Sequence, residues 1–258
     1  MGKLPLSVAI ITYNEEDRIG RTLEAVKDIA SEIVVVDSHS TDRTREIAES
    51  YGAKVYVEDW KSYAGQKNYA LEKCTQEWVL FLDADEVVSE ELKRSIVKAV
   101  NSGRADAFYL NRKTYYLGKF LEHIWQPDWV LRLAKRSSDP KWVGGSVHER
   151  LEVKGRAEKL EGYLYHYTYR DLSDHFQKSL RYARLSAGDM FRGGKRFKLH
   201  KLVLNPVWAF LKQYFIKGGF RDGIRGLSVS MSYFFSTFLK YMFLWELEQE
   251  ERRKGGRG

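Results

Sequence analysis

One stretch of this chain constrains its fold more than any other. Four apolar residues, Val79 to Leu82, run directly into Asp83, Asp85 and Glu86. An unbroken apolar run of this length is typical of a strand buried on both faces, as in the middle of a parallel sheet. Open α/β sheets bind ligands at the carboxyl ends of such strands.

The cluster of acids at the end of this strand has two interpretations. Carboxylates held close together repel one another, which favours a bound cation, and oxygen ligands favour Mg²⁺ or Mn²⁺. The alternative is that Asp83 and Asp85 cap the helix that follows.

Strands and helices are expected to alternate through the first half of the chain. Periodicity predicts strands over residues 6–12, 33–37, 54–57 and 79–83, and helices over 18–30, 42–50, 62–73 and 88–101. Such alternation predicts an α/β protein with a parallel sheet and right-handed crossovers. The sequence contains neither Gly-x-Gly-x-x-Gly nor a Walker Gly-Lys-Ser/Thr motif, so it is not a typical dinucleotide or P-loop site.

Three of the predicted strands end in polar or acidic residues. The first ends at Thr12, the second at Asp37, and the fourth at Asp83. In a doubly wound sheet these ends line up along one rim. A carboxylate at the end of the second strand can bind a ribose hydroxyl or a base edge.

The polar segments along this predicted rim resemble those of the family 2 glycosyltransferases, which have the GT-A fold. The resemblance is carried, in order and spacing, by residues 7–15, 34–42, 65–68 and 83–85. It implies a Rossmann-like, mostly parallel sheet flanked by helices, and an inverting sugar transfer from a nucleotide sugar assisted by Mg²⁺ or Mn²⁺.

The resemblance also implies site residues. Asp85 corresponds to the main metal ligand, and Lys67 stands where many members have Arg, although lysine lacks the planar fork of arginine. The residues expected to bind the nucleotide sugar are Thr12, Tyr13, Asn14, Glu15, Asp37, Lys67, Asn68, Asp83 and Ala84.

An inverting transferase needs a base that deprotonates the acceptor hydroxyl. Glu149, which follows two glycines in 144–150, is the first candidate, and Asp128 is the second. An ion pair of Glu149 with Arg150 or Arg132 is the competing interpretation. The family pattern further implies that His148 and His166 contribute to the diphosphate or metal site; a histidine among aromatic residues, such as His166, is otherwise a core residue.

Short aromatic strands are expected after residue 103, where the GT-A fold shapes its acceptor site. Trp125, Trp129 and Arg132 are the acceptor-binding candidates, with core packing as the alternative for the tryptophans.

The last third of the chain has a different character. From Phe176 it carries 17 Lys/Arg against 6 Asp/Glu, a net charge of +11, whereas the preceding residues carry −3. Helices are expected, and residues 227–245 predict an interfacial or self-packing helix rather than a span of about 20 apolar residues. The expected division is a GT-A catalytic domain over 1–170, a basic helical extension over 171–250 that meets anionic membrane, and a disordered tail over 251–258.

Nearly the whole chain resembles bacterial lipopolysaccharide core glucosyltransferases. That resemblance implies transfer of a hexose, glucose from UDP-glucose, to a heptose acceptor on a glycolipid. The lone Cys74 and a first strand in place of an export signal predict a cytoplasmic protein, peripheral on the inner face of the membrane. A polyprenyl phosphate or peptide acceptor is the alternative. A basic nucleic-acid-binding protein is disfavoured by the acidic rim, and the oligomeric state stays open.

Overall fold

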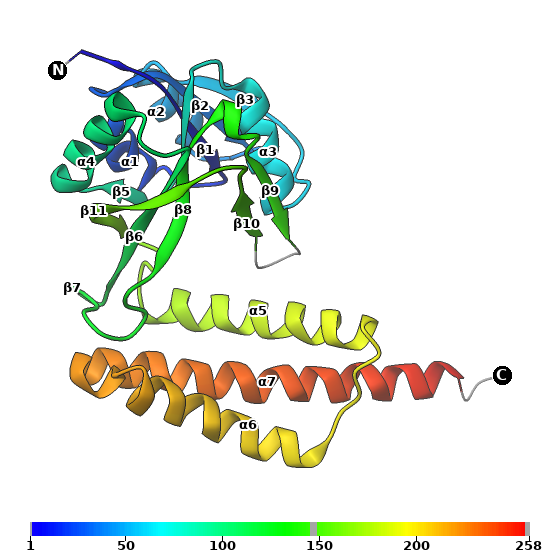
Figure 1. Cartoon of the computed structure of the whole chain (residues 1–258). Helices are drawn as coiled ribbons and strands as arrows, with labels where there is room; N and C mark the ends of the chain where they lie inside the picture. The colour runs from blue at the N-terminus through cyan, green and yellow to red at the C-terminus, as the bar shows by residue number, and fades with distance from the viewer. Residues whose placement is uncertain (1, 145–148, 256–258) are drawn as a thin grey trace. The chain divides into compact units, whose positions relative to one another are not determined.

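The computed structural model describes residues 2–144 and 149–255 (Figure 1). It divides into two compact units. Unit 1 comprises the residues up to Thr114 together with Pro127–Thr168, and unit 2 comprises Tyr115–Gln126 and the residues from Tyr169 onward. The domain boundary at residue 170 stays a prediction, because this division follows contacts rather than sequence order.

Unit 1 is organised around one mixed sheet. Its strand order is β3-β2-β1-β4-β8-β6-β11-β5. The pairs β3-β2, β2-β1, β1-β4 and β6-β11 are parallel, whereas β4-β8, β8-β6 and β11-β5 are antiparallel. The bounds are β1 Leu4–Thr12, β2 Ala30–Asp37, β3 Lys54–Val57, β4 Trp78–Asp83, β5 Glu86–Val88, β6 Ala107–Tyr116, β8 Trp129–Lys135 and β11 Ala157–His166; a separate two-stranded sheet joins β9 Lys141–Gly144 to β10 Glu149–Glu152.

The helices of unit 1 form where the sequence predicts them. They are α1 Ile19–Val26, α2 Thr44–Ser50, α3 Tyr63–Lys73 and α4 Glu90–Ser102. Ser89 caps α4 by accepting a hydrogen bond from the Leu92 N–H at 3.1 Å, and Glu90 favours the positive end of the helix dipole. The helix expected over 18–30 is too long, because α1 ends at Val26 and β2 begins at Ala30.

The core of unit 1 confirms the prediction of an α/β protein whose central strands are buried on both faces of the sheet. The alternating side chains of β1, β2 and β4 divide between two buried apolar clusters, as expected for a sheet covered on both faces. Cys74 belongs to the second cluster, and burial raises the pKa of its thiol to about 12. It is a core residue.

Unit 2 is built from long helices. These are α5 Leu172–Arg192, α6 Leu199–Leu211 and α7 Gly223–Gly255, with a π-helical turn η2 Lys212–Ile216 and a 3₁₀ turn η3 Gly219–Asp222. Helix α7 packs against both α5 and α6. The hairpin between the end of β6 and β7 (Lys119–Phe120) also belongs to this unit.

Residues 227–245 lie inside α7. Val229, Ser230, Tyr241 and Leu244 are buried there, so one side of the segment packs within the unit, whereas Phe235, Phe238 and Trp245 are exposed. Of the helices that the structure describes, none is long and apolar enough to cross a membrane. Residues 251–255 continue α7, where a disordered tail is expected from the sequence, and 256–258 lie outside the described residues.

Candidate active site

The strand register brings three of the predicted site positions to one edge of the sheet. Thr12 on β1 pairs with Asp37 on β2, and Ile11 pairs with Asp83 on β4. The ends of these parallel strands therefore form a single rim, which is the edge where open α/β sheets bind ligands.

The loops that follow β1 and β2 hold each other by hydrogen bonds. Asn14, in the left-handed region with φ 53°, accepts the Thr41 N–H at 2.8 Å and donates its own N–H to the Ser40 Oγ at 2.8 Å. Asp37 is wholly buried and accepts the Ser40 N–H at 2.8 Å. These contacts fix the turn and leave the neighbouring Tyr13 ring 56% exposed beside it.

Asp83 lies between two cations. Its Oδ1 is 2.9 Å from Lys67 Nζ, and its Oδ2 accepts a hydrogen bond from the Arg132 guanidinium at 2.7 Å. Burial disfavours the ionised carboxyl, but the Arg132 and Lys67 charges outweigh burial and hold the pKa of Asp83 far below its usual range. Asp83 is therefore a carboxylate at neutral pH.

Lys67 connects Asp83 to the candidate base. The same Nζ lies 2.9 Å from Glu149 Oε1, and it also sits 4.5 Å from the centre of the Trp142 ring. Lys67 is 3% exposed, so this contact is a buried one. Glu149 is therefore in an ion pair, as the interpretation competing with the base role expected, but its partner is Lys67 and not Arg150 or Arg132.

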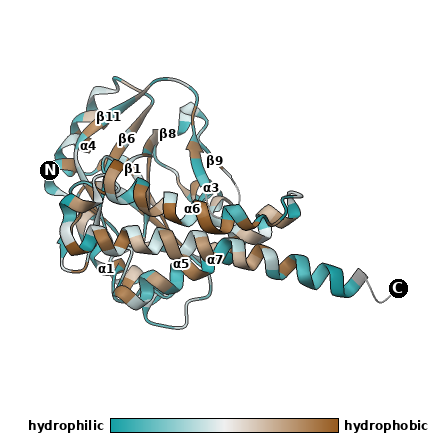
Figure 2. Cartoon of the chain, turned by 90° about the horizontal axis from the view of Figure 1, so that it is seen from below, coloured by the Kyte–Doolittle hydropathy of each residue, from teal (hydrophilic) through white to brown (hydrophobic). Residues whose placement is uncertain are grey.

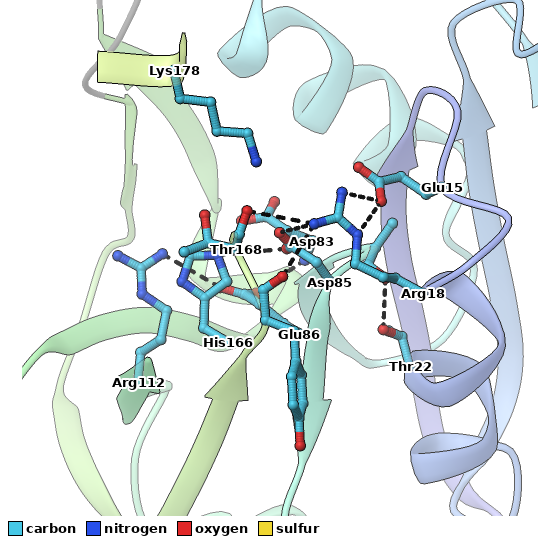
Figure 3. A network of polar contacts seen from close by, with 12 residues as sticks. Glu15, Arg18, Thr22, Asp83, Asp85, Glu86, Arg112, His166, Thr168 and Lys178 are labelled. Atoms are coloured by element: carbon cyan, nitrogen blue, oxygen red, sulfur yellow. Dashed lines mark hydrogen bonds and ion pairs between the residues drawn. The ribbon is translucent and has the colours of Figure 1, made fainter. Parts of the chain in front are cut away.

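Asp85 and His166 meet at the end of β4 and β11. His166 Nε2 lies 3.5 Å from Asp85 Oδ1, and the Arg18 guanidinium lies 3.7 Å from Asp85 Oδ2 (Figure 3). Although burial works in the opposite direction, the neighbouring His166 lowers the pKa of Asp85. Asp85 and His166 are 81 positions apart in the sequence, and the pairing of β11 with β5 brings them together by placing His166 opposite Glu86.

The donor set at Asp85 fits a divalent metal that a substrate helps to coordinate. Within residues 2–144 and 149–255, no three His, Cys, Asp or Glu side chains group as a complete metal site. The carboxylate suits Mg²⁺ or Mn²⁺, and Mg²⁺ commonly binds one or two carboxylates together with substrate phosphates. His148, the third predicted ligand, lies outside the described residues.

Three of the residues predicted to bind the nucleotide sugar make hydrogen bonds within the protein. The Asn68 amide donates to the Trp142 C=O and accepts the Trp142 N–H, both at 2.9 Å, and so holds β9 against α3. The Ala84 C=O accepts the Thr22 hydroxyl at 2.8 Å. Glu15 accepts a hydrogen bond from Arg18 Nε at 2.5 Å.

Sequence reasoning gave no role to Glu86 and Arg112. Glu86 is wholly buried; it accepts the Asp83 N–H at 2.9 Å and the Arg132 guanidinium at 3.0 Å, and Arg112 lies 3.4 Å away (Figure 3). Arg112 Nε also donates to Asp128 Oδ2 at 2.8 Å. The third acid of Asp-Ala-Asp-Glu was the only sequence signal for this network.

The three acceptor candidates are divided between the two units: Trp129 and Arg132 belong to unit 1 and Trp125 to unit 2. Arg132 is 3% exposed and holds Asp83 and Glu86. Trp129 is half-buried, with Lys159 Nζ 4.6 Å from its ring centre. Trp125 belongs to unit 2, where its Nε1 donates to the Tyr233 hydroxyl at 3.0 Å.

Several buried polar atoms around Asp83 lack a hydrogen-bond partner among the described residues. They are Thr12 Oγ1, Arg132 Nε, an Arg132 terminal nitrogen and Trp142 Nε1. Buried polar groups are normally satisfied, and exceptions gather where a ligand binds. The edge of the sheet at Asp83 therefore has the chemistry of a site for a polar, anionic ligand.

Comparison with known proteins agrees with this geometry. The family described as Glycosyl transferase family 2 matches residues 7–203. An uncharacterized glycosyltransferase of Rickettsia typhi is 34% identical, covering 96% of this chain and 89% of its own length. The lipopolysaccharide core biosynthesis glycosyltransferase LpsC of Rhizobium meliloti is 33% identical over 89% of this chain and 88% of its own.

The fold has its own match among solved structures. The mannosyltransferase PcManGT of Pyrobaculum calidifontis aligns with a TM-score of 0.55 at 16% identity, covering 93% of this chain and 87% of that one. The matched segment runs from β1 into α6 and includes the whole edge of the sheet described above. The chain belongs to glycosyltransferase family 2 and has the GT-A fold.

Proposed function

We propose that this chain transfers a sugar from a nucleotide sugar to an acceptor hydroxyl, with inversion, at the sheet edge around Asp83. The observation that carries the proposal is the contact of one lysine ammonium, Lys67 Nζ, with both Asp83 and Glu149 at 2.9 Å. It joins the Asp-x-Asp segment to the candidate base, and unpartnered buried donors surround the same carboxylate.

The donor would bind along the rim formed by the ends of β1, β2 and β4. The exposed Tyr13 ring offers a stacking surface for the base, and Asp37 stands at the end of β2, where a nucleotide ribose or base edge is recognised. Lys67 and the unpartnered nitrogens of Arg132 supply positive charge for the diphosphate.

A divalent cation would be held by Asp85 together with His166. When bound, it supplies positive charge to the diphosphate that leaves as nucleoside diphosphate. PcManGT, which shares the fold, has a solved structure in complex with GDP-Man and Mn²⁺. Arg18, 3.7 Å from Asp85, holds that carboxylate from the opposite side.

Glu149 is the preferred base. Its carboxylate would take the proton of the acceptor hydroxyl while the hydroxyl oxygen bonds to the anomeric carbon and the bond to the nucleoside diphosphate breaks. Asp128 is the second candidate. Each of the two carboxylates pairs with a cation, Asp128 with Arg112 at 2.8 Å and Glu149 with Lys67 at 2.9 Å, and Glu149 is preferred because Lys67 links it directly to Asp83.

For the acceptor, the proposal is a lipopolysaccharide core heptose, with UDP-glucose as donor. LpsC, 33% identical over 89% of the chain, is named for lipopolysaccharide core biosynthesis, and the resemblance of the sequence points to the same class. Polyprenyl phosphate and peptide acceptors remain alternatives. Family membership favours a transferase over a nucleic-acid-binding protein.

The first test is nucleoside diphosphate release from a panel of UDP- and GDP-sugars with Mg²⁺ or Mn²⁺. Glu149→Gln should lose transfer and retain donor binding, whereas Glu152→Gln, a matched change at an exposed carboxylate on the same strand, should keep both. A native chain that binds no nucleotide sugar with either metal would overturn the proposal.

The acceptor is tested separately. Transfer to heptose-containing core glycolipid, with an inverted anomeric configuration in the product, is expected. Transfer only to polyprenyl phosphate or to a peptide would reject the heptose acceptor and leave the donor half of the proposal standing.

A further inference from the structure

Unit 2 presents an apolar face to solvent along α6 and η2. Eight large apolar residues there are each at least 38% exposed, with Leu204 at 62% and Trp208 at 58%. We name it the α6 face: Leu199, Val203, Leu204, Val207, Trp208, Leu211, Phe215 and Ile216. The spacing of three and four residues places these side chains on one side of the helix.

The opposite side of α6 is firmly packed. Pro206 is buried, Leu202 joins the apolar cluster of Tyr241 and Leu244, and Asn205 Nδ2 donates to the Tyr241 hydroxyl at 2.6 Å. Helix α6 therefore has apolar residues on both sides, and packing on α7 uses only one of them. Figure 2 shows hydrophobic segments along α6, whereas the last turns of α7 are hydrophilic.

The segment that carries the α6 face contains only basic charges, and two carboxylates of α7, Glu248 and Glu251, contact Phe197 and Arg196 just before α6 begins. Residues 190–221 contain eight Lys/Arg and no Asp or Glu. Lys198 and Lys201 stand at the start of α6, and Lys212 and Lys217 stand at its end; all four are exposed. An apolar centre is thus bracketed by cations at both ends.

We propose that the α6 face docks on an anionic lipid bilayer, with the axis of α6 parallel to the membrane plane. An interfacial helix buries its apolar side among the acyl chains near the headgroups, and flanking Lys and Arg bind anionic headgroups. The proposal places the membrane contact on α6 and η2. From the sequence, an interfacial helix was expected over residues 227–245, with a self-packing helix as the alternative.

Charge decides between a bilayer and a second copy of the chain. A dimer formed through the α6 face would bring the cations at the ends of two α6 helices together, with no carboxylate from 190–221 to neutralise them. A nucleic acid would match the charge, but apart from the Trp208 indole N–H no side chain of the α6 face can donate a hydrogen bond to a phosphate backbone.

The test is sedimentation of the full chain with vesicles of phosphatidylcholine containing 30% phosphatidylglycerol, compared with pure phosphatidylcholine. Native protein should bind the anionic vesicles at least tenfold more tightly than the neutral ones, and salt should weaken binding. The double variant Leu204→Glu/Trp208→Glu should lose at least tenfold in vesicle affinity.

The matched control is Leu180→Glu/Leu185→Glu, which changes two exposed leucines on α5 and should leave vesicle binding unchanged. Circular dichroism and nucleoside diphosphate binding check that each variant is folded. Equal vesicle binding by native protein and the α6 variant would overturn the proposal. So would a native dimer that the α6 changes dissociate, without vesicle binding by the native chain, because it would assign the face to a second copy.

Discussion

The two units of this protein differ in which side chains they bury and which they expose to solvent. Unit 1 buries charged side chains: Lys67, Arg132 and Glu86 are each 3% exposed or less. Unit 2 does the reverse and leaves large apolar side chains such as Leu204 and Trp208 in solvent. Burying ions costs desolvation, and exposing apolar surface forgoes hydrophobic stabilisation, so neither arrangement is explained by stability.

This difference indicates which kind of partner each unit would bind. Around Asp83 the buried ions still contain unpartnered nitrogens among the described residues, which suits a small, highly charged ligand. On α6 the exposed side chains are aliphatic and aromatic with cations at both ends, which suits a broad apolar surface with negative headgroups. The following predictions test each side of this comparison.

The largest effect is expected from Arg132→Met. It removes the cation between Asp83 and Glu86 and leaves two buried carboxylates poorly paired, which should lower the free energy of unfolding by about 3–5 kcal/mol. Arg150→Met, which breaks an exposed pair with Glu152, should cost less than about 1 kcal/mol. Urea denaturation measures both, and equal losses would show that burial of the ions has no special weight.

Asp85→Asn should act on activity rather than on folding. The amide keeps the size of the side chain but removes the charge proposed to hold the metal, so nucleoside diphosphate release should fall on the order of 10²–10³-fold. Initial rates at saturating Mn²⁺ measure this effect. Asp17→Asn, at an exposed acid of unit 1, is the control. Unchanged rates in Asp85→Asn would remove Asp85 from the site.

A buried histidine should make unit 2 sensitive to acid. Burial lowers the pKa of His175 from 6.5 to about 4, and its Nδ1 lies 2.8 Å from the Tyr116 hydroxyl. Below pH 6.5 the unfolded chain takes up a proton that the folded chain refuses. Stability from neutral His175 is therefore complete above pH 6.5 and is lost as the pH falls toward 4, by up to about 3 kcal/mol.

This pH dependence is measured by denaturant titration at several pH values between 7 and 4. His175→Phe should flatten the slope in that range, whereas His39→Phe, at an exposed histidine of unit 1, should leave the slope as it is. A native slope that survives His175→Phe would assign the effect to other groups.

The smallest effect is expected on the α6 face. Leu204→Ser should change the free energy of unfolding by no more than about 0.5 kcal/mol, because the side chain is already in solvent. Leu244→Ala, at a wholly buried leucine of the same unit, should cost about 2–5 kcal/mol. Thermal unfolding of both variants measures the contrast, and a large loss in Leu204→Ser would mean that the face is covered within the protein.

Local features of the fold could be predicted because they depend on neighbours in the chain. Ser89 caps α4 as expected, and Ser62, where a helix was expected to begin, caps α3, since a cap needs only a side chain and the next three backbone amides. The buried strand at Trp78–Asp83 and its acidic end follow from the apolar run itself. The end of α1 at Val26 was missed, because the start of a parallel strand, rather than a local stop signal, ends that helix.

By itself, the sequence determined an α/β sheet, the polar rim at the ends of its strands, the family to which the chain belongs, and a basic helical last third. Only the tertiary structure decided the partners of the rim: Glu149 is 82 positions from Lys67, and Arg132 is 49 from Asp83. It also decided that one side of α7 packs within unit 2 while α6 shows an apolar face. The physical reason is that hydrophobic periodicity says which residues avoid water, but only three-dimensional packing determines which of them find partners in the folded chain.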